Sequence, residues 1–216
     1  NFWTGCIDHA CSAWVAMMMY DYCDYSGDVD FLRGEVLDFM QGVLRVFEAI
    51  MERNTDGVLA LPVGVSPEYG GSGMDAWGRN ASFQLAAIHR LARNLISAAD
   101  WLGCKADPFA LEIVDQLPLA SLGKFGQDAV IALWEGKALD ESHRHHSHLA
   151  SLEPFSTIDP EDSRWQKIVQ DTIKQWTVLG MGQWTGWCVP WASKIRTRLG
   201  QGEMAVFLLH YWETCF

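Results

Sequence analysis

The feature that most restricts the fold of this chain is a long stretch in which apolar residues recur every three or four positions. In DVDFLRGEVLDFMQGVLRVFEAIMERNTDG, residues 28–57, these apolar side chains fall on one face of an α-helix. Asp28 stands where an N-cap is expected, and the residues from Asn54 to Gly57 are typical of a helix end. The stretch therefore predicts a long amphipathic helix that packs against other helices.

The same periodicity returns further along the chain. A second helix is expected from Phe83 to Leu102, with Gly103 at its end, and a third begins at TIDPEDSRW with Asp159 as cap and Pro160 in the first turn. Shorter helices are expected at 7–24, 108–117, 189–199 and 202–213. Only VLALP and AVIALWE are typical of strands. The pattern predicts an all-α fold of antiparallel helical hairpins, with long loops and one or two short strands.

Composition and charge exclude some classes of function. The formal net charge of −11 disfavours binding to nucleic acid or to an anionic membrane surface. No run of roughly 18 apolar residues is present, so we expect no membrane-spanning helix. The six cysteines form no C-x-x-C pair and predict buried free thiols. Eleven tryptophans favour a carbohydrate ligand, because indole rings stack on the C–H face of a sugar, although they also fill helical cores.

Three long loops between the predicted helices hold the unusual residues of the chain. They are PVGVSPEYGGSGMDAWGRN at 62–80, ESHRHHSHLASLEPFSTIDP at 141–160 and GMGQWTGW at 180–187. Long ordered loops on a helical scaffold often carry function. We therefore look for binding and catalytic side chains in these loops.

The loop at 141–160 contains four histidines and an arginine within six positions. His143 and His145, and likewise His146 and His148, are two residues apart, a spacing that would suit a metal ion if the segment were extended. Arg144 lies inside the cluster and would repel a cation. The pattern favours a polar network that donates to the hydroxyl groups of a sugar, and we predict no metal. The remaining interpretation is that the histidines bond to loop carbonyl groups.

The loop at 62–80 contains two acidic candidates. Glu68 follows a proline and precedes two glycines, which allow a tight turn around it. A carboxyl group held in this way can act as a general acid, although a solvated loop glutamate is the alternative. Asp75 is a weaker candidate, and a loop or cap residue is the alternative interpretation.

Tryptophans gather around the third loop and the helix that follows it. Trp184, Trp187 and Trp191 surround a glycine turn. They would either form the wall of a sugar pocket or anchor the helix.

Taken in order, these segments resemble the catalytic domain of glycoside hydrolase family 95, the inverting α-L-fucosidases and related α-L-galactosidases. HRHHSHLASLEPF is similar to the family's His-Arg-His-x-Ser-His-Leu motif, and PVGVSPEYGG is similar to its Ser-Pro-Glu loop. TGWCVPWASKIRTRLGQGEMA resembles its Thr-Gly-Trp helix. YDYCDYSGDVDFLRGEV, MDAWGRNASFQL and ALWEG show weaker similarity to other family segments. The resemblance covers most of the chain.

The resemblance implies a fold and a set of roles. The fold would be part of an (α/α)6 toroid, and Glu68 would be the general acid that protonates the leaving glycosidic oxygen. The substrate-binding residues would be Arg144, His145, His143, Trp187, Trp191 and Asp75. The partner would be an oligosaccharide or glycan, without a cofactor, and the family's location suggests a secreted or periplasmic protein.

Some parts of the family pattern have no counterpart in this chain. Tyr69 follows Glu68 where family members often have asparagine, and we find no match to the family's paired asparagines or its partner carboxylate. We therefore expect residues 1–216 to be part of a single glycosidase domain, truncated at both ends, and inactive by itself. Two alternatives remain open: an (α/α)6 enzyme that acts on another sugar, and a non-catalytic helical carbohydrate-binding domain.

Overall fold

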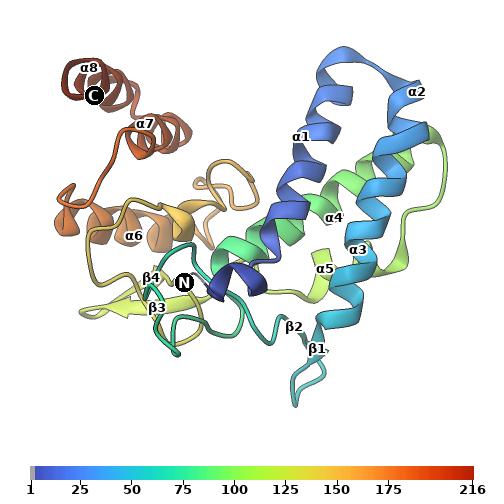
Figure 1. Ribbon diagram of the computed structural model, residues 1–216, viewed down its shortest axis with the longest axis horizontal. Coiled ribbons are helices and arrows are strands. Elements are labelled where there is room, and N and C mark those ends of the chain that lie inside the picture. The colour runs from blue at the N-terminus through green and yellow to red at the C-terminus, as the bar shows by residue number, and fades with distance from the viewer. Residues whose placement is uncertain (1–2) are drawn as a thin grey trace.

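A computed structural model describes residues 3–216 as helices joined by long loops (Figure 1). Two short antiparallel hairpins accompany the helices: β1 (Glu52–Arg53) pairs with β2 (Leu59–Ala60), and β3 (Leu122–Phe125) pairs with β4 (Asp128–Ile131). The helices are α1 (Ala10–Ser26), α2 (Val29–Phe31), α3 (Leu37–Ile50), α4 (Ser82–Leu102), α5 (Pro108–Gln116), α6 (Gln166–Leu179), α7 (Cys188–Arg198) and α8 (Gly202–Cys215). The fold is all-α and forms part of an (α/α)6 toroid, which confirms the predicted class.

The long amphipathic helix forms as its sequence predicts. The Asp28 carboxylate accepts a hydrogen bond from the backbone N–H of Phe31 at 3.0 Å and caps the start. The helix then continues through α2, a π-helical turn at Leu32–Val36, and α3. It ends at Ile50, earlier than the stop expected at Asn54 to Gly57, and the chain turns back through the β1–β2 hairpin. Asn54 accepts the backbone N–H groups of Asp56 and Val58, each at 2.9 Å, so these residues form the hairpin turn instead of the helix end.

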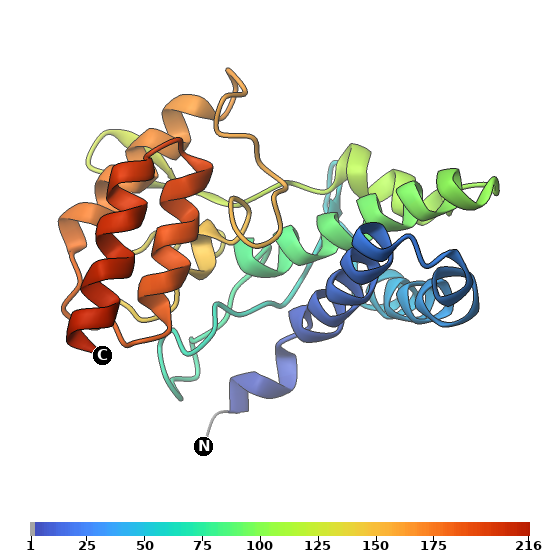
Figure 2. The same cartoon turned by 90° about the horizontal axis from the view of Figure 1, so that it is seen from above.

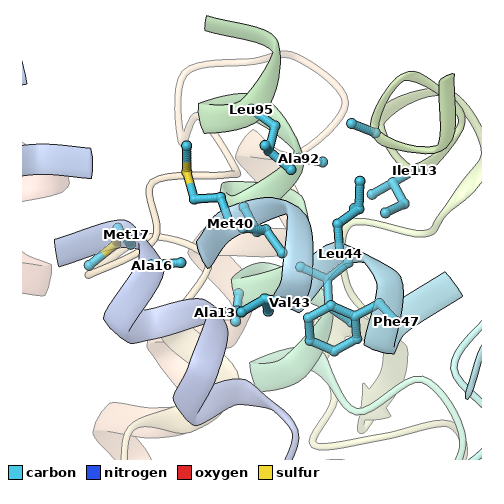
Figure 3. Close-up of a cluster of buried hydrophobic side chains, with 14 of the residues drawn as sticks. Ala13, Ala16, Met17, Met40, Val43, Leu44, Phe47, Ala92, Leu95 and Ile113 are labelled. Carbon is cyan, nitrogen blue, oxygen red and sulfur yellow. The ribbon is translucent and has the colours of Figure 1, made fainter. Parts of the chain in front are cut away.

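Helix α4 is the centre of the first core. Nearly all of its length is buried, because α1, α3 and α5 pack around it. It ends as predicted at Gly103, whose φ of +67° lies in the left-handed region that glycine adopts without strain. Figure 3 shows the apolar side chains that meet between these helices: Ala13, Ala16, Met17, Met40, Val43, Leu44, Phe47, Ala92, Leu95 and Ile113.

A second core contains the C-terminal helices and is separate from the core around α4. It combines β4 with α6, α7 and α8, and the last two helices run side by side (Figure 2). The backbone N–H of Ile131 donates to Thr172 Oγ1 at 2.9 Å and so ties β4 to α6. The three long loops predicted at 62–80, 141–160 and 180–187 are loops in the structure, apart from a 3₁₀ turn at Ser147–Leu149.

The third predicted helix begins later than its sequence suggested. It starts at Gln166 rather than at Asp159. The carboxylates of Asp159 and Asp162 instead accept the backbone N–H groups of Glu161 and Arg164, each at 2.9 Å. Such side-chain bonds to nearby backbone compete with helix formation, so the segment before Gln166 forms successive turns.

Two further predictions are adjusted by the structure. The structure adds a hairpin partner to each of the two predicted strands: β1 contains only Glu52 and Arg53, and in β3 the apolar Leu122 and Phe125 are separated by Gly123 and Lys124, so neither segment has a strand signal in the sequence. The six cysteines are free, but only Cys23 and Cys188 are buried; the four exposed ones are Cys6, Cys11, Cys104 and Cys215. No helix within residues 3–216 has the length and apolar character needed to cross a membrane.

Candidate functional site

The loop that carries Glu68 is held tightly against the histidine loop. The hydroxyl groups of Ser66 and Ser147 share a hydrogen bond, and both side chains are buried. Tyr69, also buried, donates its backbone N–H to the carbonyl of Ser66 at 3.0 Å. Between these anchors Glu68 has a φ of +61°, a strained backbone conformation for a residue other than glycine. Strain of this kind persists only where the surrounding contacts enforce it, and it is common at functional sites.

Glu68 faces the two central residues of the histidine loop. Its Oε2 atom is paired with the Arg144 guanidinium and lies 3.4 Å from His145 Nδ1. All three side chains keep access to solvent, since Glu68 is 31% exposed and Arg144 is 42% exposed. The structure thus places the predicted general acid beside two predicted sugar-binding residues, although 76 positions separate Glu68 from Arg144 in the chain.

His143 lies behind this group. Its Nδ1 atom accepts a hydrogen bond from the backbone N–H of His145 at 3.0 Å, and its ring packs on Tyr69 with centroids 4.3 Å apart. Burial, followed by the positive charge of Arg144, lowers the pKa of His143. Burial also lowers the pKa of His145 to about 4, against the opposing effect of Glu68. Both imidazoles are therefore neutral at neutral pH.

Two indole rings extend the group toward α7. The ring of His145 meets Trp187 edge-on at 5.0 Å, and Trp187 stacks on Trp191 at 5.5 Å. Trp191 is partly buried and donates its Nε1–H to the carbonyl of Glu153 at 2.8 Å. Trp187 is 48% exposed. Trp191 is therefore the more enclosed ring and Trp187 the accessible one, and the predicted part of both in sugar binding stays a prediction.

The remaining histidines of the loop have structural contacts. His146 is buried, faces the Cys188 carbonyl through Nε2 at 3.0 Å, and accepts the Trp176 Nε1–H on Nδ1 at 3.3 Å. Trp184 stacks on Trp176 and packs on His146, so it anchors the helix rather than lining an open surface. Burial lowers the pKa values of His146 and of the fully buried His148 to about 3. Within residues 3–216, no group of three or more potential ligands is arranged to hold a metal ion.

Asp75 lines a hollow of about 600 Å³ together with Tyr69, Glu135, Asp140 and Glu141, and neither Glu68 nor the histidines line this hollow. None of the ion pairs or hydrogen bonds found in residues 3–216 joins it to Glu68, so its role in sugar binding stays a prediction. The contribution of Tyr69 was missed from the sequence. Its only signal there was that it replaces the asparagine common in the resembled family.

A partial helical toroid that presents a carboxylate, a guanidinium group, imidazoles and an exposed indole from neighbouring loops defines the glycoside hydrolase class of domain. The family model described as the glycosyl hydrolase family 95 catalytic domain matches residues 3–214, and the chain belongs to this family. Alpha-L-fucosidase 2 from Arabidopsis thaliana is 24% identical over 200 residues, which cover 89% of this chain and 23% of that relative. The chain thus spans less than a quarter of the length of this curated relative.

Proposed function

We propose that this chain supplies the acid-bearing part of a glycosidase that removes a terminal α-L-fucosyl or α-L-galactosyl residue from a glycan with inversion. The observation that carries the proposal is the convergence of Glu68, Arg144 and His145 from two distant loops. Membership of glycosyl hydrolase family 95 and the similarity to an alpha-L-fucosidase support it.

Each residue of the group has a defined part in this proposal. Glu68 protonates the glycosidic oxygen as the bond to the leaving group breaks. Arg144 and His145 bond to the hydroxyl groups of the sugar, and Trp187 stacks on its C–H face. In the free protein Arg144 is paired with Glu68. Sugar hydroxyl groups would draw Arg144 away and leave Glu68 free to hold its proton.

Inversion also needs a second carboxyl group that activates water on the opposite side of the sugar, roughly 6.5–9.5 Å from the acid. We propose that residues 1–216 are one part of a single catalytic domain and that this base lies outside them. The short share of the curated relative that aligns is in keeping with this division. The expected consequence is that the 216-residue chain alone does not turn over an aryl fucoside, whereas the natural protein containing it does.

The decisive variant is Glu68→Gln in that natural protein. We expect kcat on an unactivated α-L-fucoside to fall by about 10²–10⁴. The loss should be much smaller on an aryl fucoside with an acidic phenol, because such a leaving group departs without protonation. Glu35→Gln, at an exposed glutamate in the π-helical turn between α2 and α3, is the matched control. Equal losses on both substrates would contradict the role of Glu68 as acid, and the anomer first released, followed by NMR, tests inversion.

The non-catalytic alternative has one observation in its favour. Trp187 and Arg144 present an open, sugar-compatible surface rather than an enclosed pocket. A binding domain would retain glycan affinity in both the wild type and Glu68→Gln, and the natural protein would hydrolyse no member of a panel of aryl glycosides. Turnover of a different member of that panel would instead identify an enzyme acting on another sugar.

A further inference from the structure

Tyr69, which has no assigned role, and His143, predicted only to bind substrate, connect the protein interior to the imidazole beside Glu68. Tyr69 is buried, packs its ring on His143, and donates its hydroxyl to the carbonyl of Glu141 at 3.4 Å. His143 in turn accepts the backbone N–H of His145 at 3.0 Å. His145 then presents Nδ1 to the Glu68 carboxylate at 3.4 Å. The contacts form one continuous path from Tyr69 to the proposed acid.

This path requires a particular form of His143. Since Nδ1 accepts a hydrogen bond, it carries a lone pair, and the ring is neutral with its proton on Nε2. Protonation at Nδ1 would set an N–H against the N–H of His145 and break the contact. The groups that act on the pKa of His143 are Glu68 from the opposing loop and Glu141, Arg144 and His145 from its own. Tyr69 packs on the His143 ring, and the charge of His143 in turn acts on His146 and His148.

The balance of these groups keeps His143 neutral. Burial is the largest influence and lowers its pKa, and Arg144 lowers it further. Glu141 and Glu68 act in the opposite direction but do not outweigh burial. The contact to His145 is therefore intact at neutral pH and is lost when the pH falls through the lowered pKa of His143.

We propose that Tyr69 and His143 are positioning residues that hold His145 against Glu68 only while His143 is neutral. Acidification protonates His143, breaks its contact with the His145 N–H, and so frees the His145 ring from its position beside Glu68. This inference rests on the proposed function for its effect on turnover, but the state of His143 is independent of any activity. Displacing a catalytic side chain from the substrate by about 1 Å can lower the rate on the order of 10²-fold.

Two substitutions separate the parts of the contact. His143→Phe keeps a ring on Tyr69 but has no acceptor for the His145 N–H. His143→Asn places an amide oxygen close to the position of Nδ1 and cannot titrate. We expect kcat/KM at pH 7 to fall at least about tenfold in His143→Phe and to recover largely in His143→Asn. The activity of His143→Asn should also lose the part of the acid-side decline that His143 causes in the wild type.

A matched control is available at the other end of the chain. His210 is exposed on α8, so His210→Phe should leave both the rate and the pH profile unchanged. Circular dichroism and tryptophan fluorescence of each variant report whether it folds. Should His143→Phe fail to fold, the pH profile of His143→Asn still decides, because an unchanged acid-side decline would overturn the proposal.

Imidazole ¹⁵N NMR of the natural protein tests the inference without substrate. The expected result at neutral pH is a His143 ring with its proton on Nε2 and a bare Nδ1. A proton on Nδ1, or His145 signals that do not move in His143→Phe, would overturn the positioning role. Absence of turnover in the wild type on every aryl glycoside would count against the proposed function alone, since the NMR result stands apart from it.

Discussion

The two cores of this molecule differ in the kinds of side chain that they bury. Between α1, α3, α4 and α5, the packing is almost wholly apolar, and its members come from regular helices (Figure 3). Between the histidine loop and α6 and α7, the buried imidazole of His146 packs among three indoles and bonds to Cys188 and Trp176, and the His148 ring is buried without a hydrogen-bond partner in residues 3–216. We call these regions the helical core and the histidine–tryptophan core.

The difference shows what each core contributes to the site. The apolar contacts of the helical core gain free energy in proportion to buried area and do not themselves depend on pH. The one buried histidine of α4, His89, adds a titrating group there, because burial lowers its pKa to about 4. The histidine–tryptophan core fixes the direction of its rings through hydrogen bonds, which sets the backbone of the loop that carries Arg144 and His145. Because His146 and His148 are buried, the folded state is stable only while they stay neutral, so this core should lose stability at low pH. Stability and function should therefore separate between the two regions.

The largest expected effect tests the helical core. Leu44 is fully buried between α3 and its neighbours, so Leu44→Ala should lower the free energy of unfolding by about 3 kcal/mol. The loss should be the same at pH 7 and pH 5, because no titrating group is involved. Chemical denaturation measures it, with Val46→Ala, at a valine that is 53% exposed, as a control expected to change stability by less than about 0.5 kcal/mol. If the free energy lost in Leu44→Ala depended strongly on pH, the contrast between the two cores would be wrong.

The second effect tests the histidine–tryptophan core. Burial lowers the pKa of His148 to about 3, from an ordinary value of 6.5. Between these values the unfolded chain binds a proton that the folded chain does not, so stability falls as the pH drops from 6.5 toward 3. His148→Leu should reduce this dependence by about 1.4 kcal/mol per pH unit in that window. Denaturation at several pH values measures the slope.

His148 is the sharper choice within this core because its ring nitrogens have no hydrogen-bond partner in residues 3–216. Removing the ring therefore leaves no bonded group unsatisfied. His210→Leu, at an exposed histidine, should leave the slope unchanged. An unaltered slope in His148→Leu would mean that this core tolerates charge and that the contrast between the two regions is wrong.

The helical core was largely predictable from the sequence because its signals are local. Apolar spacing, the Asp28 cap and the Gly103 end all act within a few residues, and the start at Asp28 and the end at Gly103 were both found. The two exceptions, the end of α3 and the start of α6, also have local causes. Asn54 accepts two backbone N–H groups and forms a hairpin turn beyond the end of α3. Asp159 and Asp162 bond to the backbone ahead of them and form turns where a capped helix was expected.

The histidine–tryptophan core was only partly predictable because its members depend on partners far along the chain. The sequence singled out Glu68, Arg144 and His145, and the family resemblance supplied their roles. It did not distinguish His146, which bonds to Trp176 and Cys188, from His145, which approaches Glu68. Neither did it identify Tyr69 as a packing partner of His143. Equal spacing along the chain carries no information on which ring is covered.

The smallest expected effect on stability concerns Trp187, which could support the loop, bind the sugar, or do both. Trp187 is 48% exposed, so Trp187→Ala should change the free energy of unfolding by less than about 1 kcal/mol. If its ring stacks on the sugar, affinity for the glycan should still fall about fivefold, which corresponds to about 1 kcal/mol. Trp101→Ala is the matched control, because that indole is 38% exposed at the end of α4. It should leave affinity unaltered. Equal affinity in both variants would contradict the stacking of Trp187 on the sugar and leave its ring with a supporting role alone.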